Sequence, residues 1–309
     1  MHVGVVLPQS KADWPEVLEE ARFAESLGAD SVWVVDHVLS LRPEAGILEA
    51  WTLMSALAAS TERVEIGAQV LCQSFRNPAL LAKMAATLDR VSGGRLRLLV
   101  GAGWFQQEYE AFGWDFPSPG VLVEQLRETV AILKGLLSGK PEPFTFEGTH
   151  YWVNGAVNAP QPVRSPLPIE VGGARDRVLR TVARDADGWN CPSIALPLIR
   201  DRIAFLTEQC ERSGRSIKDL RLTCQIVCAV GDDELTTKPE LAMFGPDHGL
   251  VGSVDQAVQR AGELMEQGVE GFHVITARGD RGRACLERLV NEVRPQLISE
   301  GEEQPVDRI

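Results

Sequence analysis

Two ionisable residues, Asp36 and His37, directly follow a run of β-branched and aromatic residues at 31–35. Histidine is the side chain best suited to move a proton near neutral pH, and a carboxylate beside it suits polar contacts with a ligand. The pair is equally compatible with an ordinary turn after a strand, so spacing alone leaves both interpretations open. If the strand ends at a pocket, His37 is the candidate catalytic residue.

A glycine-containing turn, Gly101-Ala-Gly103, leads into the aromatic pair Trp104 and Phe105. Glycine lets a backbone approach a ligand closely, and aromatic side chains suit a planar ligand. A lone Gly-x-Gly does not indicate a dinucleotide fold, because the third glycine and the strand–helix–strand context are missing. A tight turn with core aromatics is the alternative interpretation.

A second glycine pair, Gly172-Gly173, is followed by Ala174 and by the start of an expected helix. The free N–H groups and the dipole of a helix start attract phosphate. Arg175 or Arg177 would add positive charge there. A plain strand-to-helix turn explains the same pattern, so this segment is a candidate phosphate loop and no more.

Other chemistries find little support in the sequence. It contains no His-Glu-x-x-His or His-x-His for a metal, no Gly-x-Ser-x-Gly elbow and no P-loop, so no metal site is expected. The cysteines contain no Cys-x-x-Cys pair, and we expect buried free thiols in a reducing compartment. They are Cys72, Cys191, Cys210, Cys224, Cys228 and Cys285.

Composition narrows the range of partners. The chain has 309 residues and a formal net charge of −12, which argues against nucleic acid and anionic membranes as partners. No apolar run approaches the ~20 residues of a membrane span, and the N-terminus begins with strand-like sequence rather than a signal peptide. We therefore expect a cytoplasmic protein that acts on a small molecule.

The candidate residues lie at the ends of short apolar runs that alternate with amphipathic stretches. Such alternation predicts a parallel sheet covered by helices, and about eight units favour a closed TIM (β/α)8 barrel over an open doubly wound sheet. The expected strands are 3–7, 31–35, 64–71, 96–100, 169–171, 189–191, 222–230 and 271–276. The expected helices are 14–27, 51–59, 78–91, 121–137, 177–185, 198–213, 254–267 and 284–297.

One segment, 141–166, interrupts this rhythm after the fourth strand–helix unit. It contains several prolines and a predicted hairpin at 145–151 around Gly148, and we interpret it as an insertion carried on the barrel. The prediction is one domain over 1–298 with a polar tail at 299–309. In such barrels chemistry is carried at the C-terminal ends of the strands.

Five segments in this order resemble the luciferase-like monooxygenase superfamily, in particular its coenzyme F420-dependent oxidoreductases. The resemblance runs from about residue 2 to 192 and is weaker beyond. The segments are Ser31-Val-Trp-Val-Val-Asp-His37, Arg76-Asn-Pro-Ala-Leu-Leu-Ala-Lys-Met-Ala-Ala-Thr-Leu-Asp89, Ser92-Gly-Gly-Arg95, Gly101-Ala-Gly-Trp-Phe105 and Ala186-Asp-Gly-Trp-Asn190.

The resemblance implies a flavin-type ring across the barrel mouth, backed by a non-prolyl cis peptide that falls at Gln69–Val70. It also implies a homodimer. His37 falls on the proton donor of some members, and Trp104 and Trp189 are expected at the substrate. The residues implied to bind the cofactor are Asp36, Gln69, Val70, Cys72, Gly103, Gln107, Gly172, Gly173 and Ala174.

The sequence also departs from the family pattern. The sugar-phosphate dehydrogenases of the superfamily carry their glutamate base where this chain has Trp104, which puts a sugar phosphate in doubt as the substrate. Cys72 replaces a hydroxyl residue that contacts the ring in those enzymes, whereas Glu108 keeps a common acidic position.

These features together predict hydride transfer between coenzyme F420 and a small organic substrate. A monooxygenase that uses reduced FMN is the enzymatic alternative, because a true flavin forms an oxygen adduct whereas a deazaflavin favours hydride transfer. A catalytically silent flavin-binding protein on the same barrel is a further alternative from a different class.

Overall fold

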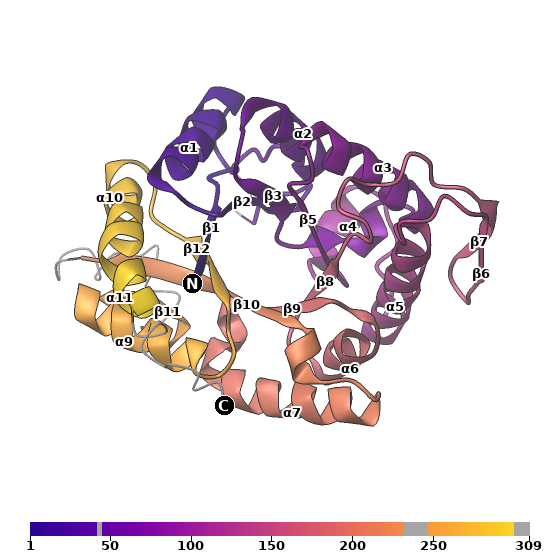
Figure 1. Cartoon of the computed structure of the whole chain (residues 1–309). Coiled ribbons are helices and arrows are strands. Elements are labelled where there is room, and N and C mark those ends of the chain that lie inside the picture. The colour runs from indigo at the N-terminus through magenta and orange to yellow at the C-terminus, as the bar shows by residue number, and fades with distance from the viewer. Residues whose placement is uncertain (42–44, 232–245, 300–309) are drawn as a thin grey trace, which may run out of the picture.

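Eight strands pair in parallel with their neighbours, and the ring closes because β9 pairs with β10. The computed structural model describes residues 1–41, 45–231 and 246–299. Figure 1 shows these strands surrounded by the helices. The closed ring confirms the barrel prediction and rules out the open sheet. The order around the ring is β12 (Gly271–Ile275), β1 (His2–Val6), β2 (Ser31–Val34), β3 (Glu65–Ala68), β5 (Leu96–Gly101), β8 (Ile169–Gly172), β9 (Gly188–Cys191) and β10 (Arg221–Val230).

The helices begin and end at residues suited to those places. Helix α1 starts after the capping box of Asp13 and ends at Gly28, whose φ of 94° lies in the left-handed region. Asn77 accepts hydrogen bonds from the first turn of α3, and Pro78 opens it. The surrounding helices are α1 (Trp14–Leu27), α2 (Ala50–Ser60), α3 (Pro78–Val91), α5 (Pro119–Leu136), α6 (Asp176–Asp185), α7 (Ile199–Arg212), α9 (Val254–Met265) and α10 (Asp280–Arg288).

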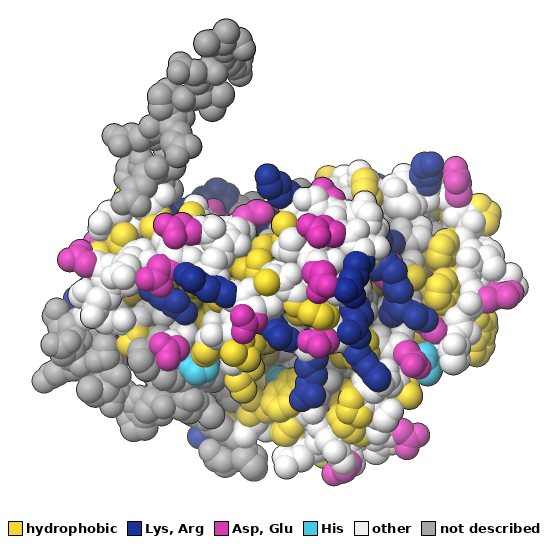
Figure 2. All heavy atoms as spheres, turned by 90° about the horizontal axis from the view of Figure 1, so that it is seen from below, with side chains coloured by type: hydrophobic (Ala, Val, Ile, Leu, Met, Phe, Trp, Pro, Cys, Tyr) yellow, Lys and Arg dark blue, Asp and Glu magenta, His cyan; other side chains and the backbone are white. Residues whose placement is uncertain are grey.

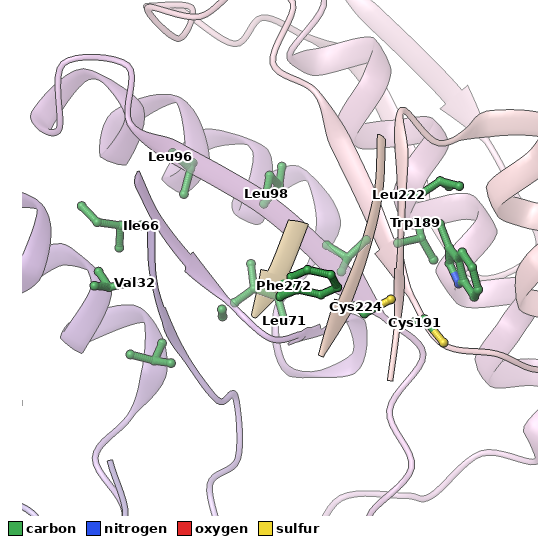
Figure 3. Packing of buried hydrophobic residues seen from close by; sticks show 14 of the residues in the cluster. Val32, Ile66, Leu71, Leu96, Leu98, Trp189, Cys191, Leu222, Cys224 and Phe272 are labelled. Atoms are coloured by element: carbon green, nitrogen blue, oxygen red, sulfur yellow. The ribbon is translucent and has the colours of Figure 1, made fainter. Parts of the chain in front are cut away.

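The two faces of each strand have different surroundings. Outward positions such as Val32, Ile66 and Phe272 join the apolar cluster between the barrel and the helices (Figure 3). Full burial of one such side chain stabilises the fold by about 1.5–3 kcal/mol. Most of the alternate, inward positions are polar or small, although Trp33 also points inward. They include His2, Ser31, Glu65, Gly67, Arg97, Glu170, Asn190, Thr223 and His273, several of which bond across the barrel interior.

The insertion carries a hairpin of β6 (Phe144–Glu147) and β7 (Trp152–Ala156), paired antiparallel. Figure 1 places it at the edge of the molecule beside α5. The carboxylate of Glu128 on α5 accepts the backbone N–H groups of Thr149, His150 and Tyr151, which attaches the turn of the hairpin to the barrel. The hairpin prediction is confirmed, with its second strand later than expected.

Several elements differ from the prediction. Strands β4 (Leu71–Cys72) and β11 (Gly249–Gly252) and helix α4 (Gln106–Ala111) were not expected, because two to six residues are too few to show a period. The last expected helix is three segments, in which a π-helical turn at Leu289–Val293 separates α10 from α11 (Arg294–Ser299). The tail from residue 300 lies outside the described residues.

The surface carries charges of both signs. Figure 2 views the face on which α7 lies and shows acidic and basic side chains interspersed with hydrophobic ones. Ion pairs there include Arg202 with Asp176 and Arg212 with Glu208. Among the described residues, no helix combines the length and apolar character needed to cross a bilayer.

The cysteine side chains are buried free thiols, as expected from their spacing. Cys224 and Cys228 lie four residues apart on one face of β10, where Cys224 is beside Cys191 and Cys228 Sγ is 3.4 Å from Cys285 Sγ. The redox compartment that we inferred from them stays a prediction.

Candidate active site

Asp36 follows the end of β2 and is fixed by several hydrogen bonds. Its carboxylate accepts Arg76 Nη1 at 2.8 Å and Nη2 at 3.1 Å, and it also accepts the backbone N–H of Cys72 at 2.8 Å. Arg76 donates a further bond to Glu49 at 2.6 Å. Burial raises the pKa of Asp36, and the Arg76 guanidinium acts against that rise. Asp36 therefore holds the loops after β2 and β3 together.

His37 is held by a buried carboxylate from α4. Its Nδ1 lies 3.1 Å from both oxygens of Glu108, and one of these oxygens also accepts the N–H of Val38 at 3.1 Å. Within the described part of the chain, His37 Nε2 has no hydrogen-bond partner, and 16% of the side chain is exposed. The free nitrogen is therefore the atom that a ligand in the mouth would meet.

Two aromatic side chains flank this imidazole. The ring centroids of Trp104 and Phe105 lie 5.7 and 5.8 Å from that of His37, each in an edge-to-face arrangement. Trp104 is 65% exposed, which is unusual for a large apolar side chain and leaves its face open for a ligand. The expected substrate contact Trp104 thus lies next to the expected catalytic residue.

The segment after β3 passes beneath this group. The peptide between Gln69 and Val70 is cis, as the family resemblance predicted. The side chain of Val70 lies between Gly101 at the end of β5 and Gly172 at the end of β8, where an added Cβ at either glycine would overlap it. Val70 therefore closes the barrel below the mouth, and only glycine fits on its two sides.

The Cys72 side chain is buried against Tyr109 of α4 rather than exposed in the mouth. Its Sγ lies 3.1 Å from Tyr109 Oη, and Gly103, with a φ of 87°, packs against both atoms. Burial raises the pKa of the Cys72 thiol to about 11. The predicted cofactor residues Cys72 and Gly103 are thus close to the site, with the thiol pointing at Tyr109.

The predicted phosphate loop precedes α6. The N–H of Gly173 donates to Asn190 O at 3.2 Å, so this group is already used. Among the described residues, the N–H groups of Ala174 and Arg175 have no acceptor, and α6 has no side-chain cap. Open amides at the start of a ten-residue helix fit a phosphate group.

Trp189 is placed differently from our expectation. It is only 1% exposed, and its indole N–H donates to Gly173 O at 2.7 Å. Asn190 bonds to Gln69 inside the barrel. Because side chains alternate along β9, Trp189 points outward toward the helices (Figure 3). The prediction that Trp189 contacts the substrate is therefore wrong, because the buried indole supports the Gly173 loop from behind.

Gln107 is exposed on α4 and lines a surface pocket of about 400 Å³ with Phe105, Gln106 and Glu110. Phe105 also lies against His37, so this pocket adjoins the mouth. Sequence reasoning missed the role of Arg76, although a cation in the polar loop after the third strand is the signal that could have suggested a partner for Asp36.

The fold and the site define a class: an α/β-barrel enzyme with its functional groups at the carboxyl ends of the strands. The chain belongs to the luciferase-like monooxygenase family, whose sequence profile matches residues 1–282. This finding confirms the resemblance that the sequence motifs indicated.

Individual relatives agree with this assignment. The chain is 32% identical over 297 residues to the "F420-dependent glucose-6-phosphate dehydrogenase" of Amycolatopsis mediterranei (strain U-32), covering 93% of this chain and 88% of that protein. The fold is similar to that of an "F420-dependent secondary alcohol dehydrogenase", with a TM-score of 0.83 and 21% identity over 96% of this chain and 98% of that one. It is also similar to the coenzyme F420-dependent tetrahydromethanopterin reductase of Methanopyrus kandleri, with a TM-score of 0.79 and 18% identity over 96% and 99%.

Proposed function

We propose that this protein transfers hydride between coenzyme F420 and a small organic substrate at the barrel mouth. The observation that carries the proposal is the Glu108–His37 pair, which leaves Nε2 facing a mouth lined by exposed aromatic surface. All three relatives described above carry F420-dependent in their names, and the two solved structures among them share the barrel. When bound, the deazaflavin ring supplies the hydride chemistry, and the protein supplies position and polarity.

The residues present fit such a cofactor. The open amides of Ala174 and Arg175 would hold its phosphate, with Arg175 adding positive charge. Val70, seated between Gly101 and Gly172, would support the ring from below. The open amides and the Val70 side chain both lie at the carboxyl ends of the neighbouring strands β5 and β8. One extended ligand therefore reaches both.

His37 is proposed to exchange a proton with the substrate at Nε2. Glu108 accepts at Nδ1, which orients the imidazole and turns Nε2 toward the substrate. Arg76 forms an ion pair with the neighbouring Asp36. Asp36 and Glu108, the two carboxylates of the mouth, therefore serve different purposes. In this arrangement His37 is the group that moves a proton, and Asp36 is a structural anchor.

The substrate is proposed to be a neutral organic molecule with an apolar part rather than glucose 6-phosphate. Trp104 fills the position at which the resemblance places the glutamate base of the sugar-phosphate dehydrogenases. Its exposed indole offers dispersion contacts but no base. This distinction matters because the relative from Amycolatopsis mediterranei is named for glucose 6-phosphate.

The first experiment measures binding of F420 and of FMN by fluorescence quenching to wild type, Ala174→Asp and the matched control Ala174→Ser. We expect F420 to bind wild type and Ala174→Ser similarly and to bind Ala174→Asp at least about 10-fold more weakly, because a carboxylate would repel the phosphate. A preference for FMN, with oxygen consumption by the reduced form, would replace the proposal by the monooxygenase alternative. Binding without turnover of any acceptor would indicate a silent flavin-binding protein.

A second experiment tests the substrate class with secondary alcohols and glucose 6-phosphate as hydride donors to F420. Wild type is expected to reduce F420 with an alcohol and not with the sugar phosphate, and Trp104→Glu is expected to lose the alcohol reaction. Efficient oxidation of glucose 6-phosphate by wild type would contradict the assigned role of Trp104.

A further inference from the structure

A closed group of polar side chains lies inside the barrel, below the candidate site. Gln69 Nε2 donates to Asn190 Oδ1 at 3.1 Å, and Gln69 Oε1 lies 3.1 Å from His273 Nδ1. Asn190 Nδ2 in turn donates to Thr223 Oγ1 at 2.9 Å. These four residues are buried and come from four different strand positions, namely β12, β9, β10 and the end of β3. None of them was singled out as chemistry-bearing by the sequence except Gln69.

The hydrogen-bond directions assign a role to His273. Its Nδ1 faces an acceptor, Gln69 Oε1, at 3.1 Å and a donor, Asn190 Nδ2, at 3.3 Å. One nitrogen satisfies only one of these partners, and we assign the hydrogen to Nδ1 because the contact with the acceptor is the shorter one. Burial, together with the charge of Arg97, lowers the pKa of His273 well below its usual value. His273 is therefore a neutral side chain that donates to Gln69.

The imidazole is fixed in place by its packing. Trp33 stacks on it with ring centroids 3.9 Å apart and planes 23° from parallel. Trp33 itself is wedged against Gly4 and Gly67, where a Cβ would overlap its ring, so it has no room to move. His273 thus presents its Nδ1–H to Gln69 from a rigid support, and its side chain is fully buried.

We infer that His273 is a positioning residue for the cofactor, acting through Gln69 directly below the site. Gln69 directly precedes Val70, whose side chain lies between Gly101 and Gly172. Gly172 in turn begins the loop that is proposed to hold the phosphate. Loss of the hydrogen bond from His273 leaves the Gln69 side chain held by Asn190 alone, and it loosens both the seat of Val70 under the ring and the start of that loop. The inference rests on the proposed function, since it concerns how the proposed cofactor is seated.

The test uses two substitutions with opposite consequences. His273→Phe keeps an aromatic ring against Trp33 but removes the donor to Gln69. His273→Asn keeps a side-chain donor near the place of Nδ1 but removes the ring. We measure the dissociation constant and the bound-state absorption spectrum of F420, together with the thermal midpoint of the free protein. His2→Phe is the matched control, because His2 lines the same interior at Ser31 and has no contact with Gln69.

We expect His273→Phe to bind F420 about 10-fold more weakly with a shifted bound spectrum, as loss of one buried hydrogen bond predicts. His273→Asn is expected to bind within about threefold of wild type despite a lower thermal midpoint, and His2→Phe to leave affinity and spectrum unchanged. If affinity follows the thermal midpoint across all three variants, His273 has only a structural role and the inference is wrong.

Three further results of these experiments have different consequences for the inference and for the proposed function. If His273→Phe does not fold, Thr223→Val serves in its place, because it removes the hydroxyl that accepts from Asn190, the other partner of Gln69, and that donates to Trp189 O; an unchanged F420 affinity and spectrum in that variant would overturn the inference. If wild type binds neither F420 nor FMN, the proposed function fails and the inference fails with it. If wild type binds F420 and the variants bind equally well, only the role of His273 is refuted.

Discussion

The two ends of this barrel both carry charged side chains, but they use them differently. At the amino ends of the strands, here called the floor, Arg97 lies between Glu170 and Glu65, and Arg164 also pairs with Glu65. At the carboxyl ends, here called the mouth, Arg76 pairs with Asp36, and Glu108 holds His37. The floor charges neutralise one another within the protein, whereas the mouth leaves His37 Nε2 and the face of Trp104 available.

The charged groups at the floor therefore serve the stability of the fold, whereas the groups at the mouth are available for chemistry. A cavity of about 290 Å³ lies at the floor, lined by Arg97, Arg164 and Arg221 among others, yet Arg97 there is already paired. Concave shape therefore does not identify the site in this molecule. The distinguishing feature of the mouth is a titratable nitrogen that the fold orients but does not satisfy.

The largest expected effect is at the floor. Arg97→Met leaves the buried Glu170 without its ion-pair partner and Glu65 with Arg164 only, and an unpaired buried carboxylate costs about 3–5 kcal/mol of unfolding free energy. Urea denaturation measures the loss. The folded fraction should still bind F420 within about threefold of wild type, because Arg97 does not reach the mouth.

Arg212→Met on α7 is the control, since its pair with Glu208 is exposed on both sides. It should cost less than about 0.5 kcal/mol. A loss of cofactor binding in Arg97→Met that exceeds its loss of stability would mean that the floor and the mouth are coupled, and the separation proposed above would fail.

The next effect is the pH dependence of stability, which also originates at the floor. Burial and the charge of Arg221 lower the pKa of His2 from 6.5 to about 4. Between those values the unfolded chain binds a proton that the folded chain does not, so the unfolding free energy falls as the pH is lowered from about 6.5 to 4. At pH 4 this effect of His2 lowers the unfolding free energy by on the order of 2–3 kcal/mol, and above pH 7 the effect is absent. Urea denaturation at several pH values should show a shallower dependence for His2→Phe than for wild type; equal slopes would contradict the assignment.

A smaller effect is expected at the mouth when one charge is removed without changing shape. Glu108→Gln still accepts the N–H of Val38 but no longer offers a negative charge to the His37 imidazole. We expect kcat for F420-dependent turnover to fall about 10-fold with the dissociation constant of F420 little changed, which corresponds to about 1.4 kcal/mol in the transition state. Glu110→Gln, on the exposed side of the same helix, should match wild type. Equal rates in the two variants would remove Glu108 from the mechanism.

Much of this architecture was predictable from the sequence. Short apolar runs and helical spacing located the eight strands and the helices to within a few residues at most positions, with helix 78–91 matching α3 at both ends. Asp36 and His37 were placed at the mouth because they follow a strand. The cis peptide at Gln69–Val70 came from the family resemblance and not from any local pattern.

Other features depend on which strands become neighbours. The ion pair of Asp36 with Arg76 joins residues that are 40 positions apart, and the contact of Gln69 with His273 joins residues that are 204 apart. Trp189 lies in a four-residue strand buried on both faces, so its direction could not be deduced from polarity. These contacts exist only once the barrel closes, and a single sequence carries no signal for them.

The smallest expected effect concerns Cys72, which lies near the mouth but is buried, as the floor residue Arg97 is. Its thiol bonds to Tyr109, and burial raises its pKa to about 11, so almost no thiolate is present at neutral pH. Native protein treated with iodoacetamide at pH 7.5 should show no label at Cys72 by mass spectrometry, although the unfolded protein is labelled. Cys72→Ser keeps a donor for Tyr109 and should change the unfolding free energy by less than about 1 kcal/mol and F420 affinity by less than about twofold. Rapid labelling that F420 prevents would instead show that the sulfur faces the ligand, and the mouth would then offer two reactive groups rather than His37 alone.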